Sequence, residues 1–290
     1  MRRTLIALFV AALTVLIWPA TALAATDPGL GTAGNFAVLA GTGTSLTNTG
    51  PSWITGAIGA AAGITGFPPG TAGPQHNADA VYITAQTDLG NAFTNASGQP
   101  VTTDYTGVNL GGLTLGPGVY NQTTAPTLTG TLTLSGGGVY IFKAGSTLVT
   151  ASGARVSLIN GAQPCDIFWV VGSSATIATS TTFVGTIMAQ AGIQMQTGAT
   201  LNGRALARTA GVTLDTNRII QPSGCPGGYT ASYPTPAYVP PPAGNILPAT
   251  LGIPWELLGS FPWLLVIGAG AGLGAAALGI SSRRRRRRSA

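Results

Sequence analysis

Charged side chains are scarce in this chain of 290 residues, and most of the positive ones are gathered at its two ends. The chain has 13 Lys and Arg against 7 Asp and Glu. Arg2 and Arg3 lie at the N-terminus, and six arginines form the run 283–288. The part in between keeps five basic and seven acidic residues, a net charge of 5 − 7 = −2. Nucleic-acid recognition needs a basic patch that neutralises phosphates, so this composition excludes a nucleic-acid binder.

Groups that could carry out catalysis are equally few. The single histidine, His76, stands where a helix is expected to begin, which favours a capping or surface role. The carboxylates are dispersed, and the chain contains no phosphate loop, zinc motif or nucleophile elbow. The sequence therefore predicts no catalytic residue, metal site or cofactor. A polysaccharide lyase that uses Asp166 or Asp215 remains the enzymatic alternative.

Only two cysteines occur, Cys165 and Cys225, and they are 60 positions apart. Two cysteines without further metal ligands are more typical of a disulfide than of two free thiols if the chain is exported. Closing a loop of this length would stabilise the fold by about 3–5 kcal/mol on the chain-entropy model.

The N-terminal segment predicts export. Arg2 and Arg3 precede an apolar stretch over 5–17, and Ala22, Leu23 and Ala24 place small residues at a cleavage position. We expect residues 1–24 to be a secretory signal peptide. The alternative is an uncleaved N-terminal anchor.

The C-terminal part predicts attachment to a membrane. A Pro-rich linker over 226–260 leads to an uncharged apolar segment, 261–280, whose helix would rise roughly 30 Å, the thickness of a bilayer core. The tail 281–290, with Arg283 and Arg284 opening the arginine run, marks the cytoplasmic end. The body would then lie on the extracellular side of the membrane, at the cell surface.

A second anchoring route is also open within the linker. Leu247, Pro248, Ala249 and Thr250 resemble the sorting signal of sortase-anchored wall proteins, although Leu251 stands where that signal has glycine. A retained transmembrane helix is the favoured route.

Threonines recur along the middle of the chain at a nearly constant step. Thr179 to Thr197 is 18 residues and Thr197 to Thr216 is 19, whereas Thr150 to Thr179 is 29. Short apolar runs that end in Gly or Asn are typical of β-strands joined by tight turns. The step predicts a β-solenoid whose coils bury their apolar sides against one another. An ordinary β-sandwich is the alternative.

One segment, 77–96, has a helical period instead of a strand period. Its apolar residues recur at spacings of three and four: Ala78, Val81, Ala85, Leu89, Ala92 and Phe93. We expect an amphipathic helix that covers one side of the solenoid.

In stacked coils the repeated threonines would form a flat row at the strand spacing of about 4.7–4.9 Å. Methyl groups would disfavour disordered hydration while hydroxyl groups hold individual waters, so such a face can present an ice-like layer. Threonine is also simply a good strand residue, and spacing alone leaves both interpretations open.

Several longer motifs resemble one known family. They are Leu30–Ala40, Gly66–Gly70, Leu158–Gln163 followed by Phe168 and Trp169, Val171–Thr176, and Thr197–Ala207. These motifs are similar to those of the microbial β-solenoid ice-binding (antifreeze) protein family over about 29–220. The resemblance implies a right-handed, discontinuous β-solenoid of triangular section with a long α-helix packed alongside.

The resemblance also implies a flat face that carries the motif Thr-Ala/Gly-any-Thr/Asn. Residues 197–200 match it fully, whereas the segments that begin at Thr150, Thr179 and Thr216 depart from it. The expected ice-binding residues are Thr49, Thr150, Thr179, Thr182, Thr197, Thr200 and Thr216. The implied function is adsorption to ice or ordered water without catalysis. The alternative is a cell-surface adhesin or glycan-binding module that contacts cell wall or glycan.

Overall fold

The computed structural model describes residues 24–225. The predictions for the signal peptide up to residue 23, the linker with its segment 247–250, the apolar segment 261–280 and the tail 281–290 lie outside this range. Within residues 24–225, no helix combines the length and the apolar character that crossing a bilayer requires.

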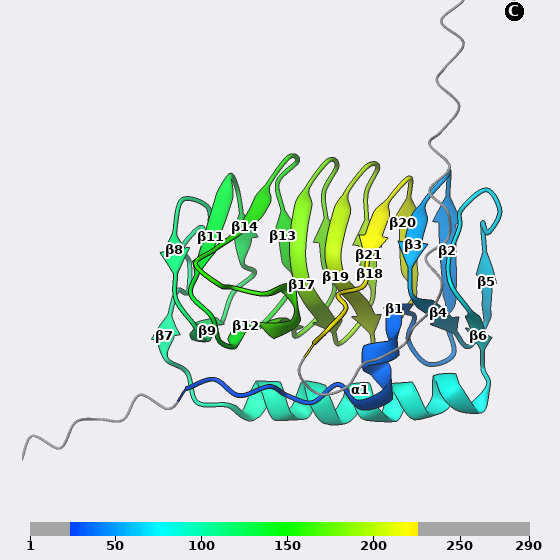
Figure 1. Cartoon of the computed structure of the whole chain (residues 1–290), viewed down its shortest axis with the longest axis horizontal. Coiled ribbons are helices and arrows are strands. Elements are labelled where there is room, and N and C mark those ends of the chain that lie inside the picture. The colour runs from blue at the N-terminus through cyan, green and yellow to red at the C-terminus, as the bar shows by residue number, and fades with distance from the viewer. Residues whose placement is uncertain (1–23, 226–290) are drawn as a thin grey trace, which may run out of the picture. The chain divides into compact units, whose positions relative to one another are not determined.

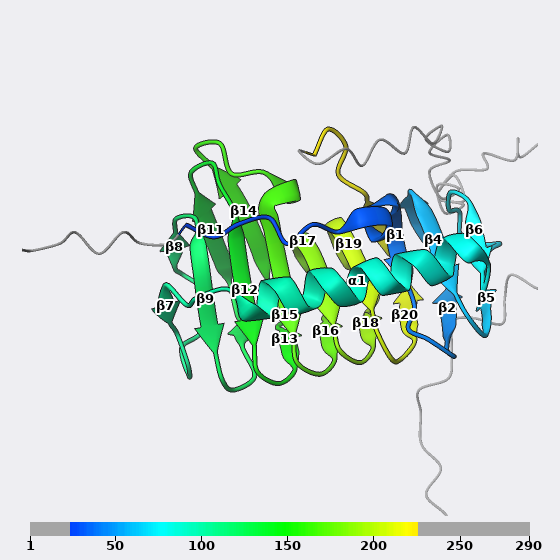
Figure 2. The same ribbon diagram turned by 90° about the horizontal axis from the view of Figure 1, so that it is seen from below.

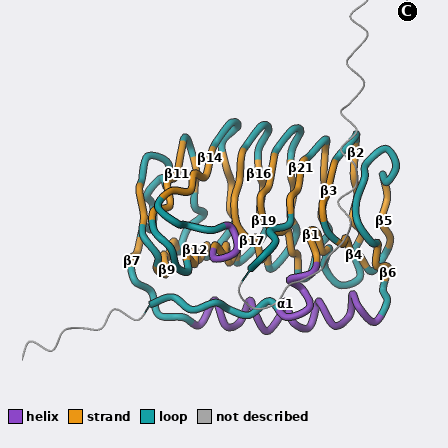
Figure 3. Tube along the Cα trace, viewed as in Figure 1, coloured by secondary structure: helices purple, strands orange, loops and turns teal. Residues whose placement is uncertain are grey.

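The strands lie one above another in successive coils, and they form a 14-stranded and a 7-stranded sheet (Figures 1 and 3). Every strand pair in the described range is parallel. This confirms a mainly β fold with parallel sheets. The sandwich alternative was wrong, because hairpin-connected sandwiches pair antiparallel strands.

The coils have three sides, which we name by what covers them. The helix side contains β6 (Gln75–Asn77), β4 (Ala57–Ala60), β1 (Phe36–Leu39), the second halves of β19 (Thr200–Ala207) and β17 (Thr182–Ala189), β15 (Ile167–Val171), β12 (Tyr140–Ala144), β9 (Gly118–Gln122) and β7 (Thr103–Asp104). The insert side contains β8 (Thr114–Leu115), β11 (Thr131–Ser135), β14 (Arg155–Ile159), the first halves of β17 and β19, β21 (Arg218–Ile220) and β3 (Trp53–Thr55). The open side contains β10 (Thr127–Leu128), β13 (Leu148–Thr150), β16 (Ala175–Ile177), β18 (Ile193–Met195), β20 (Val212–Asp215), β2 (Ser45–Thr49) and β5 (Gly63–Thr65).

Glycines let the chain bend from the insert side to the helix side inside β17 and β19. Gly185 has φ +109°, in the region that L side chains rarely adopt. A Cβ added to Gly203 would lie 1.9 Å from the carbonyl oxygen of Gly185. Only glycine can therefore occupy these two positions without steric conflict.

The chain does not climb the stack in sequence order. The first coil, β1 to β3, pairs with the last one, as β1 with β19, β2 with β20 and β3 with β21. From β6, at one end of the stack, α1 (Ala80–Gly98) runs along the helix side and delivers the chain to β7 at the other end (Figure 2). The stack is thus discontinuous, with its N-terminal coils placed on its C-terminal one.

Helix α1 confirms the predicted helix and corrects its start. It begins at Ala80, after Asp79 accepts a hydrogen bond from the Tyr82 amide at 2.8 Å. The buried residues are Tyr82, Ala85, Leu89, Ala92 and Ala96. Val81, which was expected in the buried stripe, is 47% exposed because Tyr82 takes that place. The spacing was right, but the first turn was misassigned.

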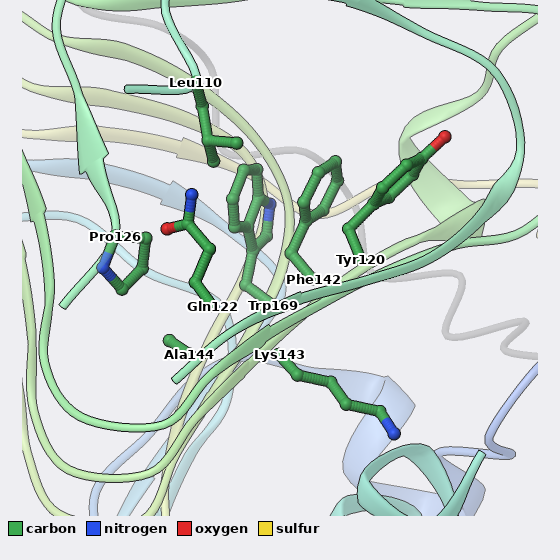
Figure 4. Close-up of a pocket in the computed structure, with 8 residues that line it drawn as sticks. All are labelled: Leu110, Tyr120, Gln122, Pro126, Phe142, Lys143, Ala144 and Trp169. Carbon is green, nitrogen blue, oxygen red and sulfur yellow. The ribbon is translucent and has the colours of Figure 1, made fainter. Parts of the chain in front are cut away.

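Aromatic side chains stack inside the coils along the axis of the stack. The ring centroids of Phe142 and Trp169 are 4.2 Å apart, and those of Tyr120 and Phe142 are 5.2 Å apart (Figure 4). A cavity of about 10 Å³ beside them also touches Gln122. It has roughly the room that one water molecule needs, far less than a small-molecule site.

The predicted disulfide between Cys165 and Cys225 is present. Cys165 lies in an insertion over residues 160–166 that separates β14 from β15 and includes the short helix η2 (Pro164–Asp166). Register gives the coil with the insertion 27 residues, from Leu148 to Ala175, against 18 for the next coil, from Ala175 to Ile193. The longer coil therefore accounts for nine of the eleven extra residues between Thr150 and Thr179, and the other two arise because Thr150 is level with Ile177.

Candidate functional site

The three sides of the coils differ in how accessible they are. Helix α1 covers the helix side, and its residues Tyr82, Ala85 and Leu89 are buried against it. On the insert side, η2 contacts β17 and β19, and the outward-facing Val184 is only 7% exposed. The open side carries no helix or insertion among residues 24–225 (Figure 2). It is the side left for contact with an extended partner.

Strand register places one outward residue from each coil into a single row on the open side, called here the outer row. The row runs Thr127, Val149, Thr176, Gln194, Thr213, Thr47 and Thr65. Five of these seven residues are threonines and none is charged. On adjacent parallel strands they repeat at about 4.7–4.9 Å.

The outer row is interrupted by one longer side chain, that of Gln194. Two shallow hollows adjoin it, one bordered by Thr176 and the other by Thr197, and both hollows also touch Thr213. The hollow bordered by Thr176 is lined by small and hydroxyl-bearing residues such as Ser174 and Gly211, whereas the hollow bordered by Thr197 also touches Asp215. Water molecules held in these hollows could hydrogen-bond to the rims while methyl groups limit their disorder.

A second line of hydroxyl groups follows the corner between the open side and the insert side. Thr179 and Thr197 are both exposed there. The Thr197 hydroxyl donates to the carboxylate of Asp215, and the Thr179 hydroxyl lies 3.4 Å from Gln196 Oε1. Asp215, at the end of β20, brings a negative charge to this edge.

The residues predicted for ice binding fall into three groups in the structure. Thr49, Thr179 and Thr197 are exposed on the open side or at its corner. Thr182 and Thr200 lie opposite each other in register on the insert side, around the corner. Residues 197–200 thus span two sides and do not form one flat patch.

Thr216 lies in a corner that differs from its neighbours. Its φ is +53°, and its hydroxyl donates to Asp215 at 3.0 Å. The turn from Leu214 to Arg218 is one residue shorter than the turn from Met195 to Thr200, because Leu214 pairs with Met195 and Arg218 pairs with Thr200. The threonine therefore does not continue the line of Thr179 and Thr197.

Thr150 was wrongly assigned to the surface. It is only 3% exposed, and its hydroxyl accepts a hydrogen bond from the Ala178 amide and lies 3.2 Å from the Thr181 hydroxyl. Pairing of Leu148 with Ala175 puts Thr150 level with the buried Ile177 and not with Thr179. Its role is to satisfy buried polar groups inside the corner.

The outer row itself was missed, although the sequence carries a signal for it. In the open-side strands one residue stands between two buried ones, as Thr176 does between Ala175 and Ile177 and Thr213 does between Val212 and Leu214. Such alternation places the middle residue on the outer face. A search for recurring threonines misses this pattern, because the outer row holds Val149 and Gln194 in two of its coils.

The titratable residues considered for catalysis are not brought together. His76 Nδ1 lies 2.7 Å from Asp79, whose pKa is lowered by the hydrogen bond from the Tyr82 amide and by His76. Burial, and secondarily Asp27, raises the pKa of Asp166, which lies in η2. Asp215 lies at the edge of the open side. Among residues 24–225, no three His, Cys, Asp or Glu side chains are grouped as metal ligands would be.

Stacked parallel coils with one uncovered, hydroxyl-rich side among residues 24–225 are typical of a solenoid that binds through an extended surface. A family model described as Ice-binding-like matches residues 38–220, and the chain belongs to this family.

Named relatives agree with this assignment. An ice-binding protein of Nostoc sp. (strain HG1) is 44% identical over 206 residues, which are 68% of this chain and 76% of that protein. An ice-binding protein of Flavobacterium frigoris (strain PS1) is 36% identical over 214 residues, 67% and 76% of the two chains. The crystal structure of an ice-binding protein from the Antarctic ascomycete Antarctomyces psychrotrophicus matches with a TM-score of 0.66 and 39% identity, covering 68% of this chain and 100% of that one.

Proposed function

We propose that this protein binds ice through its open side, without catalysis, and so acts as an antifreeze or ice-adsorption protein. The observation that carries the proposal is the outer row, which has five threonines and no charged residue and which no helix or insertion within residues 24–225 covers. Family membership and the relatives' names support the same function.

The physical basis is a match between a rigid, regular surface and ordered water. The row of methyl groups disfavours disordered hydration, while each hydroxyl group can hold a water molecule. Because the strands are fixed by the parallel ladder, little conformational entropy is lost when the face meets a crystal. A contact of this kind needs neither a deep pocket nor an ionisable group.

The insert side supports this function less well. Arg155 and Arg218 are exposed there, and the Arg218 guanidinium lies 4.8 Å from the ring centroid of Trp53. Charged groups hold water in arrangements that do not match ice, and the insertion makes this side uneven. We therefore assign Thr182 and Thr200 no direct role in ice contact.

Export and anchoring complete the proposal. The signal peptide over 1–24, the Pro-rich linker over 226–260 and the apolar segment 261–280 support an exported domain held at the cell surface. The stack would be a right-handed solenoid of triangular section. Anchoring would use a transmembrane helix, with sortase cleavage at 247–250 as the other route.

The test is ice-affinity partition of the purified fragment 25–225, combined with thermal hysteresis and recrystallisation inhibition. We expect the fragment to enter growing ice and to shape it. Exclusion of a folded fragment from ice, with crystals growing unshaped, would remove the proposal. Binding to polysaccharide or to cells in that case would identify the adhesin or glycan-binding alternative.

A further inference from the structure

The described domain ends at the corner of the coils opposite the open side. In each coil the chain passes from the open side to the insert side and then bends toward the helix side. Gly185 and Gly203 occupy that second bend in β17 and β19. After β21 the chain reaches the same bend at Gln221 and continues to Cys225. Residue 225, after which the sequence continues for 65 residues, is therefore remote from the outer row.

The last strand is also part of the junction between the two ends of the domain. β21 lies between β19 and β3, and Arg218 pairs with Trp53. Only three residues of β21 pair with β3. Together with β1–β19 and β2–β20, this pair forms the seam between the N-terminal and C-terminal coils. Without another attachment at Cys225, a force applied to the chain beyond residue 225 would act first on β21 and would separate it from β3.

The insertion over 160–166 reaches Cys225 from a distant coil. It leaves the stack between β14 and β15, and η2 contacts β17 and β19, which separate that coil from β21. Cys165 then forms the disulfide with Cys225. The insertion contributes no residue to the outer row. Its additional residues bring Cys165 to the corner where Cys225 lies.

Buried polar groups hold the same corner in place. Arg204 is 0% exposed and donates from Nε to the Gly34 carbonyl oxygen at 2.8 Å. Gln221 Nε2 donates to the same oxygen at 2.6 Å, and Arg204 Nη2 lies 3.9 Å from Cys225 Sγ. The corner thus joins the exit of the chain, the N-terminal coil and β19.

We propose that the Cys165–Cys225 disulfide bears mechanical load. A force on the C-terminal part of the chain is transmitted through the disulfide to Cys165, between β14 and β15 in the middle of the stack. The three-residue pairing of β21 with β3 then does not bear that force. This inference rests on the proposed function, because load arises only when the open side is held by ice while the C-terminal end is also held. Breaking the disulfide would let β21 peel from the seam under force, although the resting fold keeps its open side.

The experiment couples the full chain to beads through a tag placed after Ala290 and lets the beads bind an ice surface. Wild type is compared with the Cys165→Ser/Cys225→Ser variant, first at rest and then under flow. We expect equal binding at rest and at least tenfold faster detachment of the variant under flow. As a matched control, both proteins are coupled through a tag placed directly before Ala25, the first residue after the signal peptide, where the load bypasses Cys225 and their detachment rates should agree.

Equal detachment of the two proteins from the C-terminal tag, with binding at rest intact, would overturn the inference. Failure of wild type to bind ice at rest would instead count against the proposed function. Hydrogen exchange then tests the link without ice: in the variant, or in wild type treated with reductant, exchange at 218–220 and 53–55 should accelerate by a larger factor than exchange in β12. Unchanged exchange at the seam, or an acceleration there no larger than in β12, would refute the inference.

Discussion

Thr213→Tyr is the substitution that tests the open side most directly. Thr213 is exposed near the middle of the outer row, in register with Gln194 on one side and Thr47 on the other. Neighbouring strands are about 4.8 Å apart, so a tyrosine ring standing above the row would hold a flat surface away from both neighbours. Three of the seven positions would lose contact, which is about 40% of the row if each contributes equally.

We expect thermal hysteresis of fragment 25–225 to fall by more than half, because adsorption time depends exponentially on the contact free energy. The fold should persist, since the position is exposed and tyrosine is a good strand residue. Thr131→Tyr is the matched control, an exposed strand threonine on the insert side, and should keep full activity. Full activity of Thr213→Tyr together with loss in Thr131→Tyr would transfer the ice-binding role to the insert side.

Three further predictions concern single side chains. Gln194→Thr should raise thermal hysteresis, because it replaces the longest side chain of the outer row; lower activity would mean that the hollows beside Gln194 matter more than flatness. Lys143→Met should lower the free energy of unfolding by about 1–2 kcal/mol, since the ammonium group donates to the Ser97 carbonyl at 2.8 Å and to that of Gln99; denaturant unfolding measures this, with Lys143→Arg as the control. Because hydrogen bonds lower the pKa of Asp79, its ionised form stabilises the folded chain above its ordinary value of 3.8, and this contribution is lost as the pH falls below it. The melting temperature of wild type should therefore drop more steeply in acid than that of Asp79→Asn, and parallel curves would contradict this reasoning.

Features that depend on local sequence were predictable. The periodic apolar residues Ala85, Leu89 and Ala92 predicted a helix, and all three are buried in α1. The pair of cysteines predicted the disulfide. The apolar spacing determines which face of the helix is buried, and two cysteines can form only one intramolecular disulfide. Both predictions therefore need no knowledge of how distant segments pair.

Features that depend on register between distant segments were not predictable. Thr150 and Thr179 look equivalent in the sequence, yet Thr150 is level with Ile177, and a shift of this kind moves a side chain from the surface to the interior. The pairing of β3 with β21 joins residues more than 160 positions apart. The repeat length gives the spacing between successive coils but not their order in the stack. The first coil can pair with the last one because α1 then carries the chain to the opposite end of the stack.

The return helix sets the number of coils that this domain can contain. Along the helix side nine strands, from β6 to β7, occupy eight intervals of about 4.8 Å, or roughly 38 Å. The 19 residues of α1 rise about 28 Å, and the few extended residues before β7 supply the remainder. Inserting one more coil would require about three additional helical residues. An ordinary solenoid can lengthen by duplication of one repeat. In this domain an added coil also requires a longer α1, which is encoded far from the repeat. The length of the hydroxyl-bearing side is therefore limited by the length of the helix.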